Sequence, residues 1–365
     1  MTPIASSPTL TARQLLYLLM VNTFPSEVFL VPGPIIREAG KDALWGIVLA
    51  MAAAVLVALG VATVAQRVQR FGLMRFLVAH WGIAGRALLL AIGIALWLPT
   101  MNMWAGDAEV AELLLLPLTP VIVITAALGV GVLYGLSVGL RAVARLTQIL
   151  LPIGLLVVVG LVIAASPWFN LSNALPLRPE TSLGPIVHAA YQVFAFLGEI
   201  VFAFVLIGGV RTPFHVGWLV VAAVLGNGVM LFLGTMTALL MYGPQAAGTL
   251  SVPFLGAVHT IHYGFLVERV DILVGPVWVG LTMLKLIVWL LMASEVVAAA
   301  LGLGSGLWPG IVAALLGAAG SLRLPNLQMV DVSVGDLWYR AAFPAMLVLT
   351  GFVALAAHRR ARLPA

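Results

Sequence analysis

Long apolar stretches alternate with short polar connections along almost the whole chain. A helix needs about 20 residues to cross a bilayer, and windows of that length predict about ten spans, at residues 13–36, 43–66, 84–106, 119–138, 145–165, 184–208, 215–241, 272–300, 306–322 and 338–357. Two connections carry further helix signals. Residues 67–82 mix arginine with aromatics, which predicts an amphipathic helix on the inner surface. The stretch from Val252 to Tyr263 is too short to cross and predicts a re-entrant or interfacial helix.

Two of the predicted spans contain a helix breaker directly before a glutamate. The first span reads Phe24-Pro25-Ser26-Glu27-Val28, and the sixth reads Phe196-Leu197-Gly198-Glu199-Ile200. The two glutamates lie 172 residues apart, close to half of the chain. Interrupted spans at corresponding places in two halves are typical of transporter binding sites. We therefore expect the first and sixth helices to be unwound near 24–27 and 196–199 and to pack side by side.

Charged residues inside the spans are the main functional candidates. A charge at the bilayer centre costs at least ~2.5–3.5 kcal/mol on insertion scales, so Glu27 and Glu199 should face a cavity or a partner. There they would bind an amine, a cation or a proton; alternatively, they are protonated or bonded to free backbone groups. Lys285 in the eighth span would pair with Glu27 or Glu199 in a buried ion pair that opens when ligand arrives; alternatively, it snorkels or forms a fixed structural pair.

Trp97 would line a cavity or anchor the span at the membrane interface. The candidate ligand-binding residues are thus Phe24, Pro25, Ser26, Glu27, Trp97, Phe196, Leu197, Gly198, Glu199 and Lys285.

Composition strengthens the membrane prediction and limits the chemistry. Hydrophobic residues make up 62% of the chain and charged residues 8%, against about 25% charged residues in soluble domains. The absence of cysteine excludes disulfides, thiolate metal sites and thiol catalysis. The sequence has no phosphate loop, nucleophile elbow or zinc motif. We expect a single transmembrane domain over residues 1–365 that is not an enzyme, needs no cofactor or metal, and binds lipid and a small molecule but no nucleic acid.

The placement of basic residues predicts the orientation. With ten spans and a cytoplasmic N-terminus, the inner segments hold 11 basic residues and no acidic ones, whereas the outer segments hold 6 basic residues. Cytoplasmic loops carry the excess of arginine and lysine in membrane proteins. The sequence therefore predicts a multi-pass protein with both termini in the cytoplasm.

A series of motifs, in order, resembles the spore germination permeases, the B subunits of nutrient-germinant receptors in endospore-forming bacteria. The motifs are Pro32-Gly33 with residues 38–45 after the first break, 142–146 before the fifth span, 171–176 in an outer loop, Gly198-Glu199 in the sixth span, and 264–269 followed by Lys285 in the eighth. Together they cover nearly the whole chain. Glu27 departs from the family, which more often has a small or apolar residue there, so the acid is expected to hold a basic group or to favour a different ligand.

The resemblance implies both a fold and a function. The family is similar to permeases of the amino acid–polyamine–organocation superfamily, which implies an all-α bundle of two inverted five-helix repeats, here roughly 13–165 and 184–357, with broken first and sixth helices. It also implies a receptor subunit in the spore inner membrane that binds an amino-acid-like germinant and works with a soluble-domain A subunit and a lipoprotein C subunit. The alternative is a secondary transporter of an amino acid or polyamine, because the same site would serve both.

Overall fold

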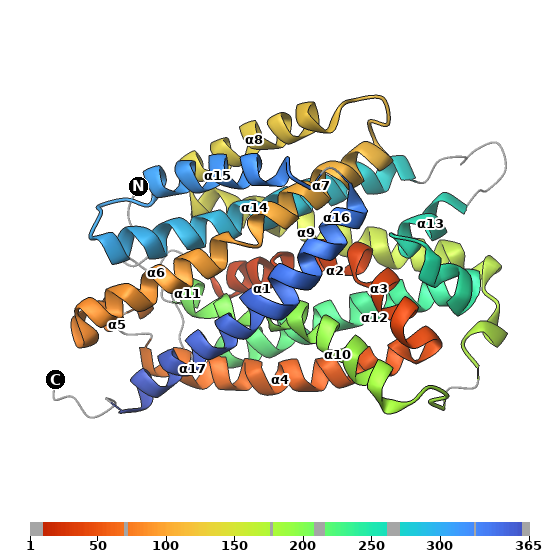
Figure 1. Cartoon of the computed structure of the whole chain (residues 1–365), viewed down its shortest axis with the longest axis horizontal. Coiled ribbons are helices and arrows are strands. Elements are labelled where there is room, and N and C mark those ends of the chain that lie inside the picture. The colour runs from red at the N-terminus through yellow and green to blue at the C-terminus, as the bar shows by residue number, and fades with distance from the viewer. Residues whose placement is uncertain are drawn as a thin grey trace.

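The computed structural model describes residues 10–68, 72–175, 178–207, 216–260, 271–324 and 326–359. Within these ranges the regular structure is entirely helical, and most helices run along one common direction (Figure 1). Among the described residues, eight helical segments have the length and apolar composition of membrane spans: Pro32–Val64, Ile83–Leu113, Val121–Val138, Leu140–Trp168, Leu183–Ile207, Val216–Thr249, Val274–Leu301 and Leu327–Leu355. The chain is therefore a multi-pass helical bundle.

The ten predicted spans correspond to these eight segments, one short apolar helix and one broken helix, whose last part is the beginning of the segment Pro32–Val64. The short helix is α15 (Leu307–Ser321). The broken helix consists of α1 (Ala12–Val21), α2 (Phe24–Leu30) and α3 (Pro32–Ala39), each too short to cross a bilayer alone. From α3 the chain turns through η1 (Gly40–Asp42) into α4 (Ala43–Val68).

The remaining elements follow the predicted order. Their bounds are α5 Leu73–Trp81, α6 Ile83–Trp97, α7 Thr100–Leu114, α8 Val121–Val138, α9 Leu140–Ala165, η2 Ser166–Trp168, η3 Leu171–Asn173, α10 Leu183–Leu197, η4 Gly198–Phe202, α11 Ala203–Ile207, α12 Val216–Thr249, α13 Pro253–Thr260, α14 Asp271–Leu301, α16 Leu327–Ser333, η7 Val334–Ala342 and α17 Phe343–Arg359. The helices predicted within 67–82 and 252–263 are α5 and α13 in their described parts. The motif at 264–269 lies outside the described residues.

Both predicted breaks exist, but the first lies earlier than predicted. Helix α1 ends at Val21 and α2 begins at Phe24, so the break falls on Asn22 and Thr23. Residues 24–27 are helical instead of unwound because Pro25 occupies the first turn of α2, where its missing N–H and fixed φ are compatible with a helix.

The second break begins at Gly198, where α10 gives way to the 3₁₀ segment η4, so it lies slightly later than predicted and Phe196 and Leu197 are still helical. A Cβ atom at this position would lie 2.5 Å from the ring of Phe343. Glycine therefore allows α17 to approach the break closely.

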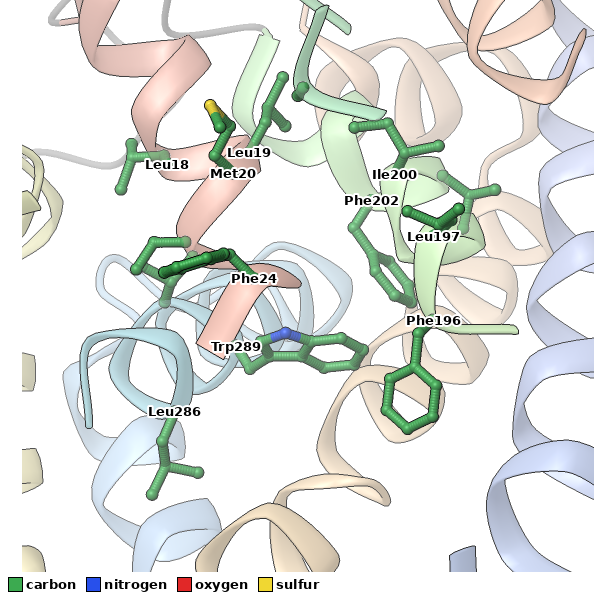
Figure 2. Packing of buried hydrophobic residues seen from close by; sticks show 14 of the residues in the cluster. Leu18, Leu19, Met20, Phe24, Phe196, Leu197, Ile200, Phe202, Leu286 and Trp289 are labelled. Carbon is green, nitrogen blue, oxygen red and sulfur yellow. The ribbon is translucent and has the colours of Figure 1, made fainter. Parts of the chain in front are cut away.

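The two breaks lie side by side, as expected. Helix α1 contacts α11, and the Glu199 carboxyl after the second break is within hydrogen-bonding reach of the Thr23 hydroxyl at the first. Figure 2 shows Trp289 of α14 lying between Phe24 after the first break and Phe202 in the second. The Trp289 and Phe202 rings meet edge to face, with centroids 4.7 Å apart.

Two predicted spans are longer in the structure. The third was predicted to end at residue 106, but α7 continues to Leu114 after a turn at Pro99. The last was predicted to begin at residue 338, but α16 and the π-helical segment η7 extend it back to Leu327. The acidic residues in both extensions lower the mean hydropathy of the window, so the sequence prediction assigned these residues to connections. A hydropathy window does not take account of the helix face on which a polar residue lies.

Candidate functional site

A cavity of about 390 Å³ lies between the broken helices and the helices that face them. Its walls come from α2, α3, α7, α10, η4, α14, α16 and η7. The closed end is formed by three buried charged residues, Asp107, Glu199 and Lys285. His188 and Arg340 line the other end, with side chains 58% and 80% exposed. The cavity thus leads from a solvated mouth to a charged group deep in the bundle.

An ion pair between the sixth and eighth spans closes the cavity. Lys285 Nζ lies 3.2 Å from Glu199 Oε1 and 3.1 Å from Oε2, and the two side chains are 2% and 1% exposed. The ammonium group also lies 5.8 Å from the Phe196 ring and 5.9 Å from the Trp289 ring, within cation–π range. The predicted pairing of Lys285 with Glu199 is confirmed, and the snorkelling alternative is wrong.

Asp107 is a second buried carboxylate at the closed end, and the sequence prediction missed it. It lies on α7, within hydrogen-bonding reach of the Thr282 hydroxyl and close enough to Lys285 for a direct electrostatic interaction. The sequence prediction ended this span at residue 106 and so assigned Asp107 to an outer connection. The apolar residues Ala105, Ala108 and Ala111 on either side of it could have indicated that the helix continues.

Glu27 is buried beside the ion pair but is not part of the cavity wall. Its side chain has no exposed surface, and neither carboxylate oxygen has a hydrogen-bond partner among the described residues. Glu199 and Lys285 are its charged neighbours. Lys285 therefore lies close to three buried carboxyl groups, those of Glu27, Asp107 and Glu199.

Three other lining residues carry buried polar atoms without a partner among the described residues. Asn102 Nδ2 and Trp338 Nε1 are unpaired donors, and Gln192 Oε1 is an unpaired acceptor. The other polar atom of each side-chain amide has a hydrogen-bond partner. Asn102 Oδ1 accepts from Ser333 Oγ at 2.7 Å, and Gln192 Nε2 is 3.3 Å from His188 Nδ1. The cavity therefore offers both donors and an acceptor to a ligand. The sequence analysis did not select Trp338 as a candidate because it was the first residue of the predicted span 338–357.

The structure brings some of the sequence candidates together and separates others. Ser26, Phe196, Glu199 and Lys285 line the cavity. Four more are buried next to the breaks and do not line the cavity: Phe24, Pro25, Leu197 and Gly198. The Pro25 carbonyl, for example, accepts from Trp278 Nε1 at 3.0 Å.

Trp97 lies away from this group. Its Nε1 donates to the Ala313 carbonyl at 2.9 Å, and its ring lines a different, apolar cavity.

Solved structures with this fold are transporters. The substrate-bound, outward-open state of a Na⁺-coupled sialic acid symporter matches with a TM-score of 0.67 and 11% identity, over 99% of this chain and 92% of that one. The Eremococcus coleocola manganese transporter matches with a TM-score of 0.60 and 16% identity, over 94% and 77%. The inward-facing conformation of Mhp1 matches with a TM-score of 0.51 and 17% identity, over 97% and 77%. At these identities the likeness concerns the fold alone.

Among curated proteins, none matches the sequence. The sequence profile of the family described as spore germination protein matches residues 9–304. The match includes both helix breaks, Asp107 and the Glu199–Lys285 pair, and it spans most of the 365 residues. The chain therefore belongs to the spore germination permease family, whose members are the membrane subunits of germinant receptors.

Proposed function

We propose that this subunit binds a small zwitterionic amine, an amino acid or a close analogue, in the cavity between the broken helices, and that binding triggers germination. The observation that carries the proposal is the buried Glu199–Lys285 pair at the closed end of the cavity, with Asp107 beside it. Buried charges in a membrane bundle mark substrate and ion paths more often than they contribute stability.

The polar groups of the cavity match the two ends of such a ligand. An ammonium group is attracted by the carboxyl groups of Asp107 and Glu199 at the closed end of the cavity. A carboxylate is attracted by Lys285 and by the free donors of Asn102 and Trp338. The volume of about 390 Å³ lies at the small end of the range for ligand pockets, roughly 300–1,000 Å³.

Binding would be transmitted through the ion pair. Glu199 belongs to the broken sixth span and Lys285 to the continuous α14. A zwitterion that reaches both groups replaces their contact with contacts to itself and removes a constraint between the two helices. A ligand shifts a conformational equilibrium by its difference in affinity for the two states, so the germinant would favour the state in which this pair is open.

A secondary active transporter of an amino acid or polyamine is the alternative function. It is favoured by the likeness to solved transporters in both outward-open and inward-facing states. Uptake of radiolabelled ligand by proteoliposomes distinguishes the two functions. A sensor binds the ligand without concentrating it, whereas a transporter uses an imposed proton gradient to accumulate the ligand inside the proteoliposomes.

The test of the proposal is a thermal-unfolding screen of the purified protein against amino acids, polyamines, sugars and nucleosides. We expect amino acids to raise the unfolding temperature, and an active amino acid to lose its effect when its amine or its carboxylate is blocked. Stabilisation by sugars or nucleosides alone would contradict the proposal, as would stabilisation that survives blocking of both groups.

The proposed setting is the spore inner membrane, with A-type and C-type receptor subunits as partners and both chain ends in the cytoplasm. The orientation is based on the excess of arginine in the predicted inner segments. Because the chain has no cysteine, labelling of a single cysteine introduced at position 361 shows on which side of the membrane the C-terminal end lies. We expect an impermeant thiol reagent to label this cysteine only after the membrane is opened; labelling of intact cells would overturn the orientation.

A further inference from the structure

Two further cavities lie away from the ligand cavity, around α5, α6, α14 and α15. One, of about 470 Å³, is lined by Arg75, Arg86, Glu295 and Ser305 among others. The other, of about 450 Å³, is bounded almost entirely by apolar side chains, including Ile94, Val297 and Val312. Leu303 lines both, so the two cavities are neighbours that meet at this side chain. In Figure 1, α5 and the connection from α14 to α15 lie together at the left end of the bundle.

The two cavities differ in the chemistry that they offer. Arg75 and Arg86 are exposed side chains at the polar end, where Glu295 is the one acid among the described lining residues. The apolar end is a groove on the outer surface of the bundle, since Ile94 and Val312 are 52% and 54% exposed. A molecule that fills both needs an anionic head and a long apolar tail.

We propose that these cavities bind an anionic phospholipid, with its phosphate between Arg75 and Arg86 and an acyl chain in the groove beyond Leu303. Basic pockets between membrane helices on the cytoplasmic side bind the headgroups of anionic lipids. The arginines lie at the end of the bundle predicted to be cytoplasmic, and α5 lies against α6 and α14 there. The bound lipid braces α14, the helix that also carries Lys285.

The inference is independent of the germinant proposal and has its own test. The purified protein is mixed with phosphatidylglycerol or phosphatidylcholine in one detergent, and bound lipid is counted by native mass spectrometry. We expect phosphatidylglycerol to be retained in preference to phosphatidylcholine. Each arginine near a membrane surface changes anionic-lipid affinity about fivefold, so Arg75→Gln/Arg86→Gln should lower retention at least ~10-fold.

A matched control removes the same charge elsewhere. Arg141 and Arg145 are exposed on the first turns of α9 and do not line either cavity, so Arg141→Gln/Arg145→Gln should retain phosphatidylglycerol as the wild type does. Equal loss in both double variants would overturn the site, because binding would then follow net charge alone. Unchanged retention in Arg75→Gln/Arg86→Gln would overturn it as well.

The apolar half of the site is tested separately. Val312→Trp is expected to fill the groove and to lower phosphatidylglycerol retention while the arginines remain. Inorganic phosphate, which has no acyl chain, is expected not to compete with the lipid. Full retention in Val312→Trp, or competition by inorganic phosphate at concentrations equal to those of the lipid, would show that the headgroup alone binds and would contradict the proposal.

Discussion

Replacing Lys285 with methionine is expected to destabilise the protein strongly, by about 3–5 kcal/mol. Methionine keeps the length and apolar stem of lysine but removes the charge. Glu199, whose side chain is 1% exposed, then stays buried without its counter-ion, and Glu27 and Asp107 lose the cation that they share. The measurement is the midpoint of thermal unfolding in detergent, followed by size-exclusion recovery after heating.

The same substitution at a half-exposed ion pair is the matched control. Lys41, whose side chain is 13% exposed, lies 2.7 Å from Glu180, whose side chain is 49% exposed. A pair with one well-solvated partner contributes about 1 kcal/mol or less. Lys41→Met should therefore unfold close to wild type. The double variant Lys285→Met/Glu199→Gln removes both charges and should recover much of the loss. If Lys285→Met unfolds like Lys41→Met, the deep charges do not depend on each other as described.

Replacing Asp107 with asparagine is expected to weaken binding of an amino-acid ligand by ~10- to 100-fold. A hydrogen bond to a charged group contributes about 1.5–3 kcal/mol, and each 1.4 kcal/mol is a tenfold change in affinity. Asparagine keeps the shape of the side chain and its contact with Thr282 but offers no negative charge to an ammonium group. Isothermal titration calorimetry with the amino acid found in the screen measures the effect.

Two comparisons make the Asp107 result specific. Glu112 lies on the same helix and does not line the cavity, so Glu112→Gln should bind the ligand with wild-type affinity. The hydroxy-acid analogue, which lacks the amine, should bind Asp107→Asn and wild type equally. Loss of affinity for this analogue as well would assign Asp107 a structural role in place of contact with the ammonium group.

Much of the fold follows from hydropathy and from the two breaks. The apolar windows located the spans because a crossing helix must be apolar for its whole length. The echo between Glu27 and Glu199 located the two interruptions. The pairing of Lys285 with Glu199 was also foreseeable, because a buried lysine in a bundle needs an acid within reach. These predictions depend on local composition, which a single sequence displays directly.

The parts of the site that were missed depend on tertiary packing. Asp107 and Trp338 lie at positions where the hydropathy windows predicted a span to end or begin. The helices α7 and η7 continue past these positions because they pack against neighbouring helices. Glu27 and Glu199 look equivalent in sequence, yet Glu199 lines the cavity and Glu27 lies outside the cavity wall. The side of a helix that faces a cavity depends on how the neighbouring helices pack against it, which local composition does not display.

The most direct test of the central claim is ligand protection of a cysteine inside the cavity. Ser26 lines the cavity, and the chain has no cysteine of its own, so Ser26→Cys reacts there alone with a small thiol reagent. We predict that the germinant amino acid slows this reaction in proportion to its occupancy, while a cysteine at the exposed position 180 reacts at an unchanged rate. A ligand that binds Ser26→Cys with full affinity and leaves its labelling rate unaltered would contradict the account.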